Sequence, residues 1–229
     1  SAGKIKRLLI NVPPGSMKSL LVNVFWPAWE WASNPSLRLL SASYSGALSL
    51  RDNLRLKNIV TSAWYKTHYK VAISEDQNAK GRYNTTAGGW RIATSVKGVG
   101  TGEHPDRIVV DDPTSADQAK SDVERSAAND WFDTTVSSRG VTRGVSIVIV
   151  MQRLHQEDLS GHVLKQPGRW THVCWPMRYD AKRPGLRDPR TEPGQLLWPD
   201  LFDEIKVRQL ELDLGPYNAA GQLQQLPAP

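Results

Sequence analysis

Apolar and polar residues follow one another along the chain in a pattern that predicts buried strands separated by amphipathic helices. Short runs rich in Leu, Ile and Val fall at residues 7–12, 37–43, 107–110 and 144–151. Runs of this length are typical of parallel strands that are covered on both faces. The pattern therefore predicts an α/β fold with a mainly parallel central sheet flanked by helices.

The other helices and strands are predicted from apolar residues at helical spacing, from residues that favour helix N-caps, and from prolines that interrupt helices. Pro27 should kink or split the first helix. The weakly patterned stretch 71–89 is expected to hold a hairpin around Asn84. Helices are predicted over 19–32, 45–64 with Ser45 as N-cap, 117–132 with Val123, Ala127 and Trp131 on one face, and 203–214, and a last strand over 170–176.

The first apolar run leads into a sequence suited to binding phosphate. Pro13-Pro14-Gly15 ends the strand, and a Lys-Ser pair stands where the next helix begins. The unpaired N–H groups and the dipole of a first helical turn both point at a bound anion. Lys18 would reach the β- and γ-phosphates and the Ser19 hydroxyl would bind Mg²⁺. The predicted nucleotide-binding residues are Pro14, Gly15, Ser16, Met17, Lys18 and Ser19.

This loop is poor in glycine. In the usual spacing G-x-x-x-x-G-K-[ST], the two glycines would fall at Val12 and Met17. Glycine permits positive φ and a close approach of backbone to phosphate, so this loop must follow another path or carry strain. The hypothesis is that Pro13-Pro14-Gly15 redirects the backbone and makes Met17 tolerable.

Two acids, Asp111 and Asp112, follow the strand predicted at 107–110. An Asp pair after a strand is common by itself, because acids also cap helices and start turns. Together with Lys18 and Ser19, however, the pair predicts an ATPase site. Asp111 would hold Mg²⁺ at the strand tip and Asp112 would polarise the attacking water as the catalytic base.

Three further segments carry polar residues of interest. The central strand ends at Gln152, where open α/β sheets bind ligands, so Gln152 can sense the γ-phosphate. Residues 97–102 are either a surface loop or a mobile segment that contacts DNA or nucleotide. Residues 178–194, rich in Arg and Pro, are a loop that is either a solvated connection or a basic surface for DNA phosphates or a docking partner.

Composition narrows the class of protein. The 229 residues carry a net charge of +6, which is compatible with a polyanionic partner such as nucleic acid. The single cysteine, Cys174, excludes an internal disulfide framework and suits a reducing compartment. We expect no signal peptide, and no apolar run approaches the roughly 20 residues of a membrane span. The expected location is the cytoplasm.

Five segments, in this order, resemble the ATPase domain of the large terminase subunit of tailed bacteriophages. They are VPPGSMKS, SASYS, TSVKGVGTG, RIVVDDP and IVIVMQRLHQEDLSGHVL, and the stretches LLWPDLF and LGPYNAAGQLQQLPAP are similar to the segment that precedes the family's nuclease domain. The resemblance implies a P-loop NTPase fold of the ASCE type with an ATPase core over 1–159. A small helical subdomain and linker toward an absent nuclease would occupy 160–229.

The resemblance implies an ATP-hydrolysing motor, using ATP and Mg²⁺, that moves double-stranded DNA into a procapsid. No nuclease activity is expected from this fragment. Asp112 stands where the family usually has glutamate, and Gln152 matches its coupling segment. The implied partners are double-stranded DNA, the portal protein, the small terminase subunit and further copies of the chain in a ring on the capsid, in the host cytoplasm, with no membrane.

Members of the family also use an arginine finger from a neighbouring subunit. Arg139, Arg143 and Arg153 are the candidates, and Arg139 is favoured because residues 137–140 have the composition of an exposed loop. Two alternatives stay open: a P-loop helicase or repair ATPase, and a hydrolysis-deficient scaffold that binds DNA or docks a partner.

Overall fold

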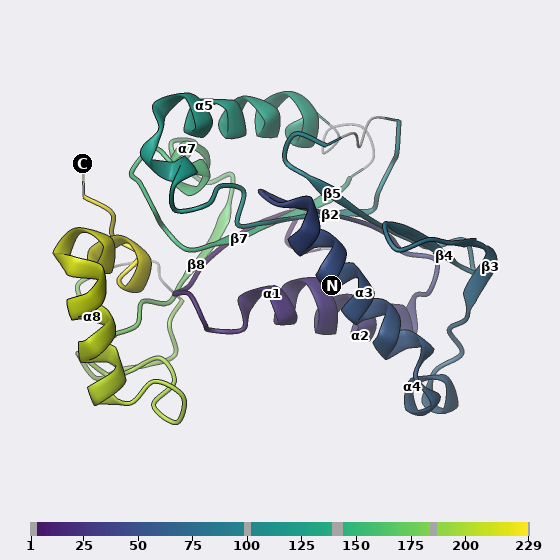
Figure 1. Ribbon diagram of the computed structural model, residues 1–229, viewed down its shortest axis with the longest axis horizontal. Helices are drawn as coiled ribbons and strands as arrows, with labels where there is room; N and C mark the ends of the chain where they lie inside the picture. The colour runs from purple at the N-terminus through teal and green to yellow at the C-terminus, as the bar shows by residue number, and fades with distance from the viewer. Residues whose placement is uncertain (1–3, 99–101, 139–143, 184–186, 229) are drawn as a thin grey trace. The chain divides into compact units, whose positions relative to one another are not determined.

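A computed structural model describes residues 4–98, 102–138, 144–183 and 187–228 of the chain. Eight strands form one sheet in the order β3-β4-β5-β2-β6-β7-β1-β8 (Figure 1). The strands are β1 (Arg7–Asn11), β2 (Arg38–Ser43), β3 (Ile73–Asn78), β4 (Arg82–Thr85), β5 (Trp90–Ser95), β6 (Arg107–Asp111), β7 (Ser146–Met151) and β8 (Thr171–Cys174).

Helical segments connect most of these strands. Four are short or irregular turns, of which η2 is 3₁₀-helical and η1, η3 and η4 are π-helical. The segments are α1 (Lys18–Leu20), η1 (Leu21–Phe25), α2 (Trp26–Ser33), α3 (Gly46–Thr61), α4 (Ala63–His68), η2 (Gln118–Lys120), α5 (Asp122–Trp131), η3 (Phe132–Ser137), α7 (Leu159–Leu164), α8 (Glu204–Asn218) and η4 (Ala219–Leu223).

The predicted α/β fold with a mainly parallel sheet is confirmed. β2 pairs in parallel with β5 and β6, and β1 pairs in parallel with β8. β4 pairs antiparallel with β3 and with β5, and its pairing with β5 forms the hairpin expected near Asn84. β7, the predicted central strand, lies between β6 and β1 in the sheet order, so strands cover both of its edges.

The chain divides into two compact units, each built from separate stretches. One unit comprises Ser1–Lys6, Ser19–Pro113 and Asp130–Val148, and the other comprises Arg7–Lys18, Thr114–Asn129 and Ile149–Pro229. We call them the first and the second unit. The functional boundary predicted between residues 159 and 160 stays a prediction.

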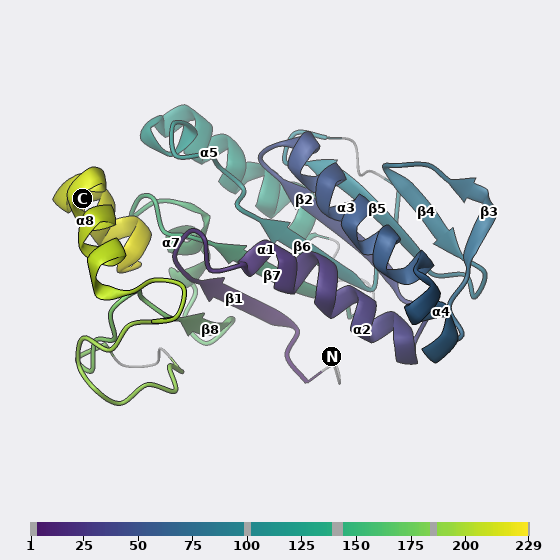
Figure 2. The ribbon, with the colours of Figure 1, turned by 60° about the horizontal axis from the view of Figure 1, so that its bottom comes forward.

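In the first unit, helices α2 and α3 pack beside one another and against the strands (Figure 2). Their apolar side chains form a core with residues of β2 and β4, among them Trp31, Leu39, Leu56 and Tyr83. At the start of β6, the buried Arg107 forms an ion pair with the buried Glu30 of α2. This pair compensates two charges that would otherwise be costly to bury.

The first helix is irregular beside Pro27, where the sequence predicts a kink or a split. It widens into the π-helical turn η1 just before the proline, and the N–H of Trp26 donates to the carbonyl of Leu21, five residues back. Proline lacks the N–H that would bond the carbonyl of Asn23, four residues back. That carbonyl instead accepts a hydrogen bond of 3.2 Å from the guanidinium of Arg91.

In the second unit, helix α8 begins where the sequence predicts it. The Asp203 carboxylate accepts from the N–H of Lys206 at 2.8 Å and caps the helix. Val207 packs with Met177 and with Leu223 of η4 in a small core. Gly215, with a non-helical φ of 70°, ends the first helical stretch of α8 after Leu214, in agreement with the predicted 203–214, and a second stretch from Pro216 runs to Asn218.

Two helix predictions need correction. The helix expected over 45–64 stops at Thr61, because the Ser62 side chain caps a new helix, α4, by accepting from Tyr65 N–H. In α5, Val123 is 75 % exposed, whereas Arg125 and Ala128 are buried, so the predicted apolar face is rotated. Within the described ranges, the helices are all too short or too polar to cross a bilayer.

Candidate nucleotide-binding site

The loop after β1 carries two residues in the left-handed region. Gly15 has φ 75° and Met17 has φ 57°. The Ser16 hydroxyl donates to the carbonyl of Pro13 at 2.7 Å and closes the turn. Met17 therefore adopts a backbone conformation that glycine adopts without cost, and it carries the strain rather than avoiding it. Helix α1 begins at Lys18, with Ser19 in its first turn, as predicted.

Gly15 also has a packing constraint within the second unit. A Cβ atom added to Gly15 would lie 2.9 Å from Cζ of Phe202, a residue of the segment just before α8. A side chain at this position would have to push the ring away. The loop conformation is thus tied to an aromatic residue that lies far away in the sequence.

The predicted metal-site residues line a small pocket in the first unit. It has room for about one water molecule, with a volume of about 20 Å³. Residues of the continuous segment α1–η1, of the end of β2, of α3 and of the end of β6 line it. The lining residues include Ser19, Asn23, Ser49, Arg51, Asp111 and Asp112. The structure thus brings together three residues that the sequence predicts for Mg²⁺ binding and catalysis.

The two acids have different environments. Asp111 is the last residue of β6 and is 5 % exposed, and its Oδ2 accepts from Nδ2 of Asn23 at 2.8 Å. Asp112 is half-buried and has φ 42°, which an aspartate tolerates better than most residues. Its carbonyl accepts from the N–H of Tyr44 at 3.0 Å, just after β2. The buried, hydrogen-bonded Asp111 suits the role of a metal ligand, and the less buried Asp112 suits the role of a base.

The pocket's donor set fits a magnesium ion. Ser49 is buried, lines the pocket, and its Oγ has no hydrogen-bond partner within the described part of the chain. Such a hydroxyl needs a partner supplied by whatever fills the pocket. Carboxylate and hydroxyl oxygens are the ligands that Mg²⁺ prefers, and the ion usually keeps several waters and shares its other ligands with phosphates.

A dedicated protein cage for a metal is not seen. Among residues 4–98, 102–138, 144–183 and 187–228, no three His, Cys, Asp or Glu side chains group closely enough to hold an ion. A site with one or two carboxylates agrees with this, because Mg²⁺ bound with nucleotide takes most of its remaining ligands from phosphate and water.

Asn23, Ser49 and Arg51 are among the lining residues that sequence reasoning missed. Arg51 Nε donates to Oδ1 of Asp52 at 3.0 Å, and its side chain is 46 % exposed. The hydrogen bond to Asp52 raises the pKa of Arg51, with smaller contributions from the nearby charges. One signal could have found Arg51 and Ser49. They follow a strand that neighbours β6 in the sheet, and the carboxyl ends of parallel strands share one edge.

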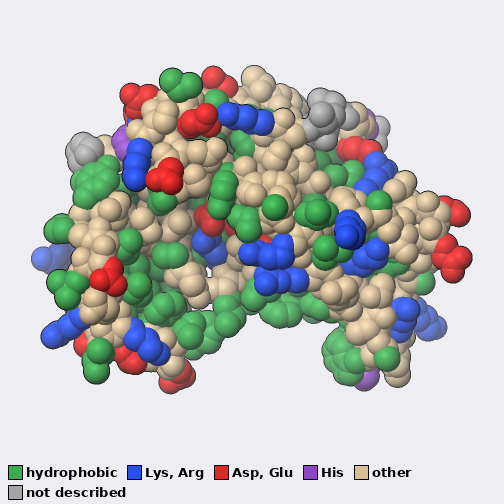
Figure 3. Space-filling model, in the orientation of Figure 1, with side chains coloured by type: hydrophobic (Ala, Val, Ile, Leu, Met, Phe, Trp, Pro, Cys, Tyr) green, Lys and Arg blue, Asp and Glu red, His purple; other side chains and the backbone are tan. Residues whose placement is uncertain are grey.

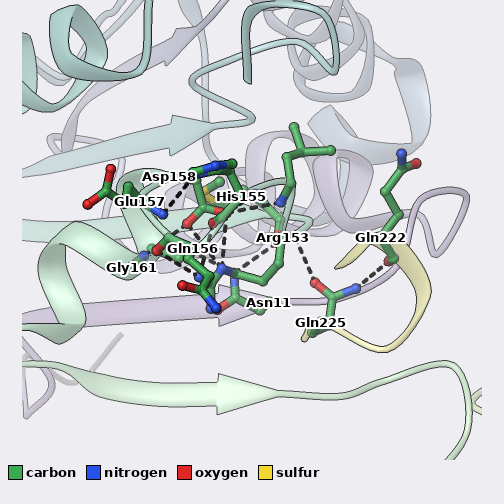
Figure 4. Close-up of polar contacts among 12 residues, drawn as sticks. Asn11, Arg153, His155, Gln156, Glu157, Asp158, Gly161, Gln222 and Gln225 are labelled. Carbon is green, nitrogen blue, oxygen red and sulfur yellow. Dashed lines mark hydrogen bonds and ion pairs between the residues drawn. The ribbon is translucent and has the colours of Figure 1, made fainter. Parts of the chain in front are cut away.

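In the second unit, Gln152 directly follows β7, and the next residue, Arg153, is bound within its own turn (Figure 4). Arg153 Nε donates to both carboxylate oxygens of Asp158 at 3.0 Å, and its terminal nitrogen Nη2 donates to the carbonyl of His155 at 3.2 Å. Asp158 also accepts from Gly161 N–H and so caps α7. This guanidinium is not presented to solvent, since its side chain is 12 % exposed.

The other arginine-finger candidates, Arg139 and Arg143, lie outside the described residues, as do positions 99–101 of the glycine-rich loop. In the segment 178–194, Arg178 binds Glu204 and Glu211 of α8, and Arg190 binds Asp188. These two arginines of the predicted basic loop are therefore engaged in ion pairs within the second unit.

The fold and the loop together define the class. A strand, a loop that ends in Lys-Ser and a helix, with an Asp-Asp strand in the same sheet, make a P-loop NTPase-type α/β fold. No protein-family model matches the sequence, and no curated protein matches it. Solved structures do match.

A large terminase from a thermophilic bacteriophage, solved in complex with ADP, matches with a TM-score of 0.59 and 8% sequence identity, over 97% of this chain and 48% of that one. A second structure in the same crystal form gives 0.58 and 8% over the same shares. A further crystal form gives 0.51 and 10%, over 76% of this chain and 41% of that one. The chain has the fold found in phage large terminases, and it spans about half of their length.

Proposed function

We propose that this chain is the ATP-hydrolysing motor domain of a phage large terminase, which drives double-stranded DNA into a procapsid in the host cytoplasm. The observation that carries the proposal is the pocket shared by Ser19, Asp111 and Asp112, in a chain with the large-terminase fold. One of the matching terminases was solved in complex with ADP, which supports a nucleotide ligand for this chain as well.

The roles follow from the chemistry of each group. Lys18 and the N–H groups of the loop bind phosphate oxygens. Ser19 and Asp111 would hold Mg²⁺, which would supply positive charge beside the phosphate oxygens. Asp112 accepts a proton from the attacking water. Gln152, after the central strand, reports loss of the γ-phosphate, and Arg139 of a neighbouring copy stabilises the transition state.

Positive charge is scattered over the face drawn in Figure 3. Lys and Arg side chains lie there in small separate groups among acidic and hydrophobic ones. The net charge of +6 is compatible with DNA but does not mark one patch on that face. The DNA, the portal protein and the small terminase subunit are proposed as partners on the resemblance alone.

The test is ATP hydrolysis measured against protein concentration, with and without double-stranded DNA. We expect turnover per chain to rise with concentration, because a ring supplies the arginine of a neighbour. Lys18→Ala and Asp112→Asn should abolish it, and Arg139→Ala should reduce it about a thousandfold at high concentration. Lys120→Ala and Asp117→Asn serve as matched controls, because both side chains are highly exposed.

Three outcomes separate the candidate functions. Turnover that depends on concentration and is lost in both active-site variants supports the motor. Nucleotide binding without hydrolysis at any concentration, with or without DNA, favours the hydrolysis-deficient scaffold. Absence of nucleotide binding contradicts the P-loop assignment itself.

A further inference from the structure

We infer that Asn23 is a positioning residue, which holds the Asp111 carboxylate in the orientation that binds Mg²⁺. The inference rests on the proposed function of the pocket. Asn23 lies in η1, one turn after the phosphate loop, and Asp111 ends β6. Asn23 Nδ2 donates to Asp111 Oδ2 at 2.8 Å, and both residues line the pocket.

The partners of Asn23 fix which way its amide faces. Arg91 can only donate hydrogen bonds, and one of its terminal nitrogens lies 3.2 Å from Oδ1 of Asn23. The Ser41 hydroxyl of β2 lies 2.8 Å from the same oxygen. Because the oxygen faces these donors, the NH₂ group must face Asp111. Asn23 therefore acts as a donor to the carboxylate, which orients it without competing for a metal.

Burial makes this arrangement rigid. Asn23, Ser41 and Arg91 are each at most 2 % exposed. Arg91 also donates from Nε to Oδ1 of Asn53 at 3.2 Å, so its guanidinium is held from both sides. Burial lowers the pKa of Arg91, and the charge of Asp111 acts in the opposite direction. The positive guanidinium of Arg91 and the carboxylate of Asp111 thus contact opposite ends of the Asn23 amide.

The backbone contributes a second attachment. Pro27 leaves the carbonyl of Asn23 without a helical partner, and the same Arg91 nitrogen that contacts Oδ1 also donates to this carbonyl at 3.2 Å. One guanidinium therefore holds both the backbone and the side chain of Asn23. The π-helical turn before Pro27 is the local irregularity that makes this possible, and such turns are frequent at functional sites.

Residues that hydrogen-bond metal-ligating groups typically change metal affinity 10–100-fold when they are replaced. Asn23→Asp is the sharpest change, because it keeps the shape and the acceptor for Ser41 and Arg91. It replaces the donor by a second carboxylate that faces Asp111. The repulsion would turn Asp111 away from the ion, or the new acid would draw the ion toward itself.

The experiment measures binding of a fluorescent ATP analogue while Mg²⁺ is titrated, so that no turnover is required. For Asn23→Asp we expect the Mg²⁺ concentration at half-maximal binding to change about tenfold or more. Nucleotide binding in EDTA should stay within about twofold of that of the unmodified chain, because Lys18 and the loop N–H groups are untouched.

A double variant separates positioning from folding. Asn23→Asp with Asp111→Asn reverses the hydrogen bond and preserves the buried charge beside Arg91. We expect thermal stability to recover toward that of the unmodified chain, whereas the Mg²⁺ dependence stays altered. If the Mg²⁺ dependence recovers together with stability, the Asp111 carboxylate is not the group that binds the ion, and the inference is wrong.

A milder variant covers the case in which Asn23→Asp does not fold. Ser41→Ala removes one donor to Asn23 Oδ1 and leaves Asn23 and Asp111 in place, and we expect a two- to threefold change in the Mg²⁺ midpoint. An unchanged midpoint overturns the inference. If the unmodified chain does not bind nucleotide, or binds it without any dependence on Mg²⁺, the proposed function itself is wrong. Failure of the proposed function is therefore distinguished from failure of the inference about Asn23.

Discussion

Met17 is the non-glycine residue of the phosphate loop that has a positive φ. Its φ of 57° lies in the region that costs an ordinary residue about 1–2 kcal/mol. The side chain is 46 % exposed, so packing offsets little of this cost. The strain is instead imposed by the loop's ends, which are held by strand β1 and by the start of α1. Strained backbone of this kind is common in ligand-binding loops.

Substitutions at Met17 should reveal this strain. Met17→Gly is expected to leave the free energy of unfolding unchanged or raise it by up to about 1 kcal/mol, because relief of strain outweighs the greater entropy of unfolded glycine. Met17→Val should lower it by about 1–2 kcal/mol, since a β-branched residue fits positive φ poorly. Urea denaturation of the three chains measures both effects, and equal stabilities would show that the loop relaxes.

Gly161 offers a second test at the residue scale. A Cβ atom here would overlap the carbonyl oxygen of Gln156, within the turn that also holds Arg153 and Asp158 (Figure 4). Gly161→Ala should lower the free energy of unfolding by about 3 kcal/mol. Gly81→Ala is the matched control, because no atom lies within 4 Å of a Cβ there. We expect it to stay within about 0.5 kcal/mol in the same denaturation assay.

The residues that belong to a recognisable motif were predictable from the sequence, whereas the residues that line the pocket beside them were not. Lys18, Ser19, Asp111 and Asp112 stand at strand ends or helix starts, and their types alone indicate phosphate and metal chemistry. Asn23 and Ser49 are ordinary polar residues within helical patterns. Their role depends on which helices lie beside β6. That arrangement depends on the order of strands in the sheet, which the local pattern of apolar residues does not predict. A buried amide beside an acid can therefore be found only once the sheet is known.

At the scale of elements, the edge pair β1–β8 contains a half-buried titratable group. His172 of β8 lies with Nε2 at 2.8 Å from Oδ1 of Asn11 on β1. Burial, followed by the charges of Arg153 and Arg183, lowers the pKa of His172 to about 4. Asn11 Nδ2 in turn donates to the carbonyl of Met151 and to the hydroxyl of Ser160. The neutral imidazole is therefore part of the packing of the second unit.

This lowered pKa predicts a pH dependence of stability. In the unfolded chain His172 takes up a proton below pH 6.5, but in the folded chain only below about pH 4. The unfolded state therefore binds more protons between these values, and stability falls as the pH falls through this window. The difference corresponds to roughly 3 kcal/mol, and His172 adds no further loss below it.

Denaturation between pH 7 and pH 4 tests this expectation. His172→Gln keeps a donor for Asn11 and should flatten the curve by most of that amount, whereas His68→Gln, at an exposed position of α4, should leave it unchanged. Parallel curves for all three chains would mean that His172 titrates normally.

The elements themselves were largely predictable, because buried strands and capped helices have strong local signals. The strands at β1, β2, β6, β7 and β8 fall where apolar runs predict them. The faces of helices were less predictable. Val123 is exposed and Arg125 is buried, because Arg125 pairs with Asp122 and donates to the carbonyl of Ala119. Polar contacts of this kind decide which face of a helix is buried when only a few apolar residues mark the predicted face.

At the scale of the molecule, the two compact units need not have the same stability. The single cysteine, Cys174, lies in the second unit and is 3 % exposed. Burial raises the pKa of its thiol, so both access and thiolate content are low. A thiol reagent should therefore leave the native chain unmodified and report unfolding of the second unit alone.

Tryptophan fluorescence of a variant with Phe at positions 170, 175 and 198 provides the comparison, since the remaining tryptophans, including the fully buried Trp31, lie in the first unit. If the units unfold together, thiol exposure and the fluorescence change will have the same urea midpoint. Separate midpoints would show independent unfolding, with ADP and Mg²⁺ shifting one or both. Rapid modification without denaturant would contradict the buried position of Cys174.

The contact between Gly15 and Phe202 has a consequence for the evolution of the chain. Gly15 is constrained both by its positive φ and by the ring that occupies the space of a side chain. A lineage that acquires a larger residue at position 15 must move or lose the aromatic ring at position 202. The two positions should therefore change together among descendants, and an aromatic residue at 202 should accompany glycine in the phosphate loop.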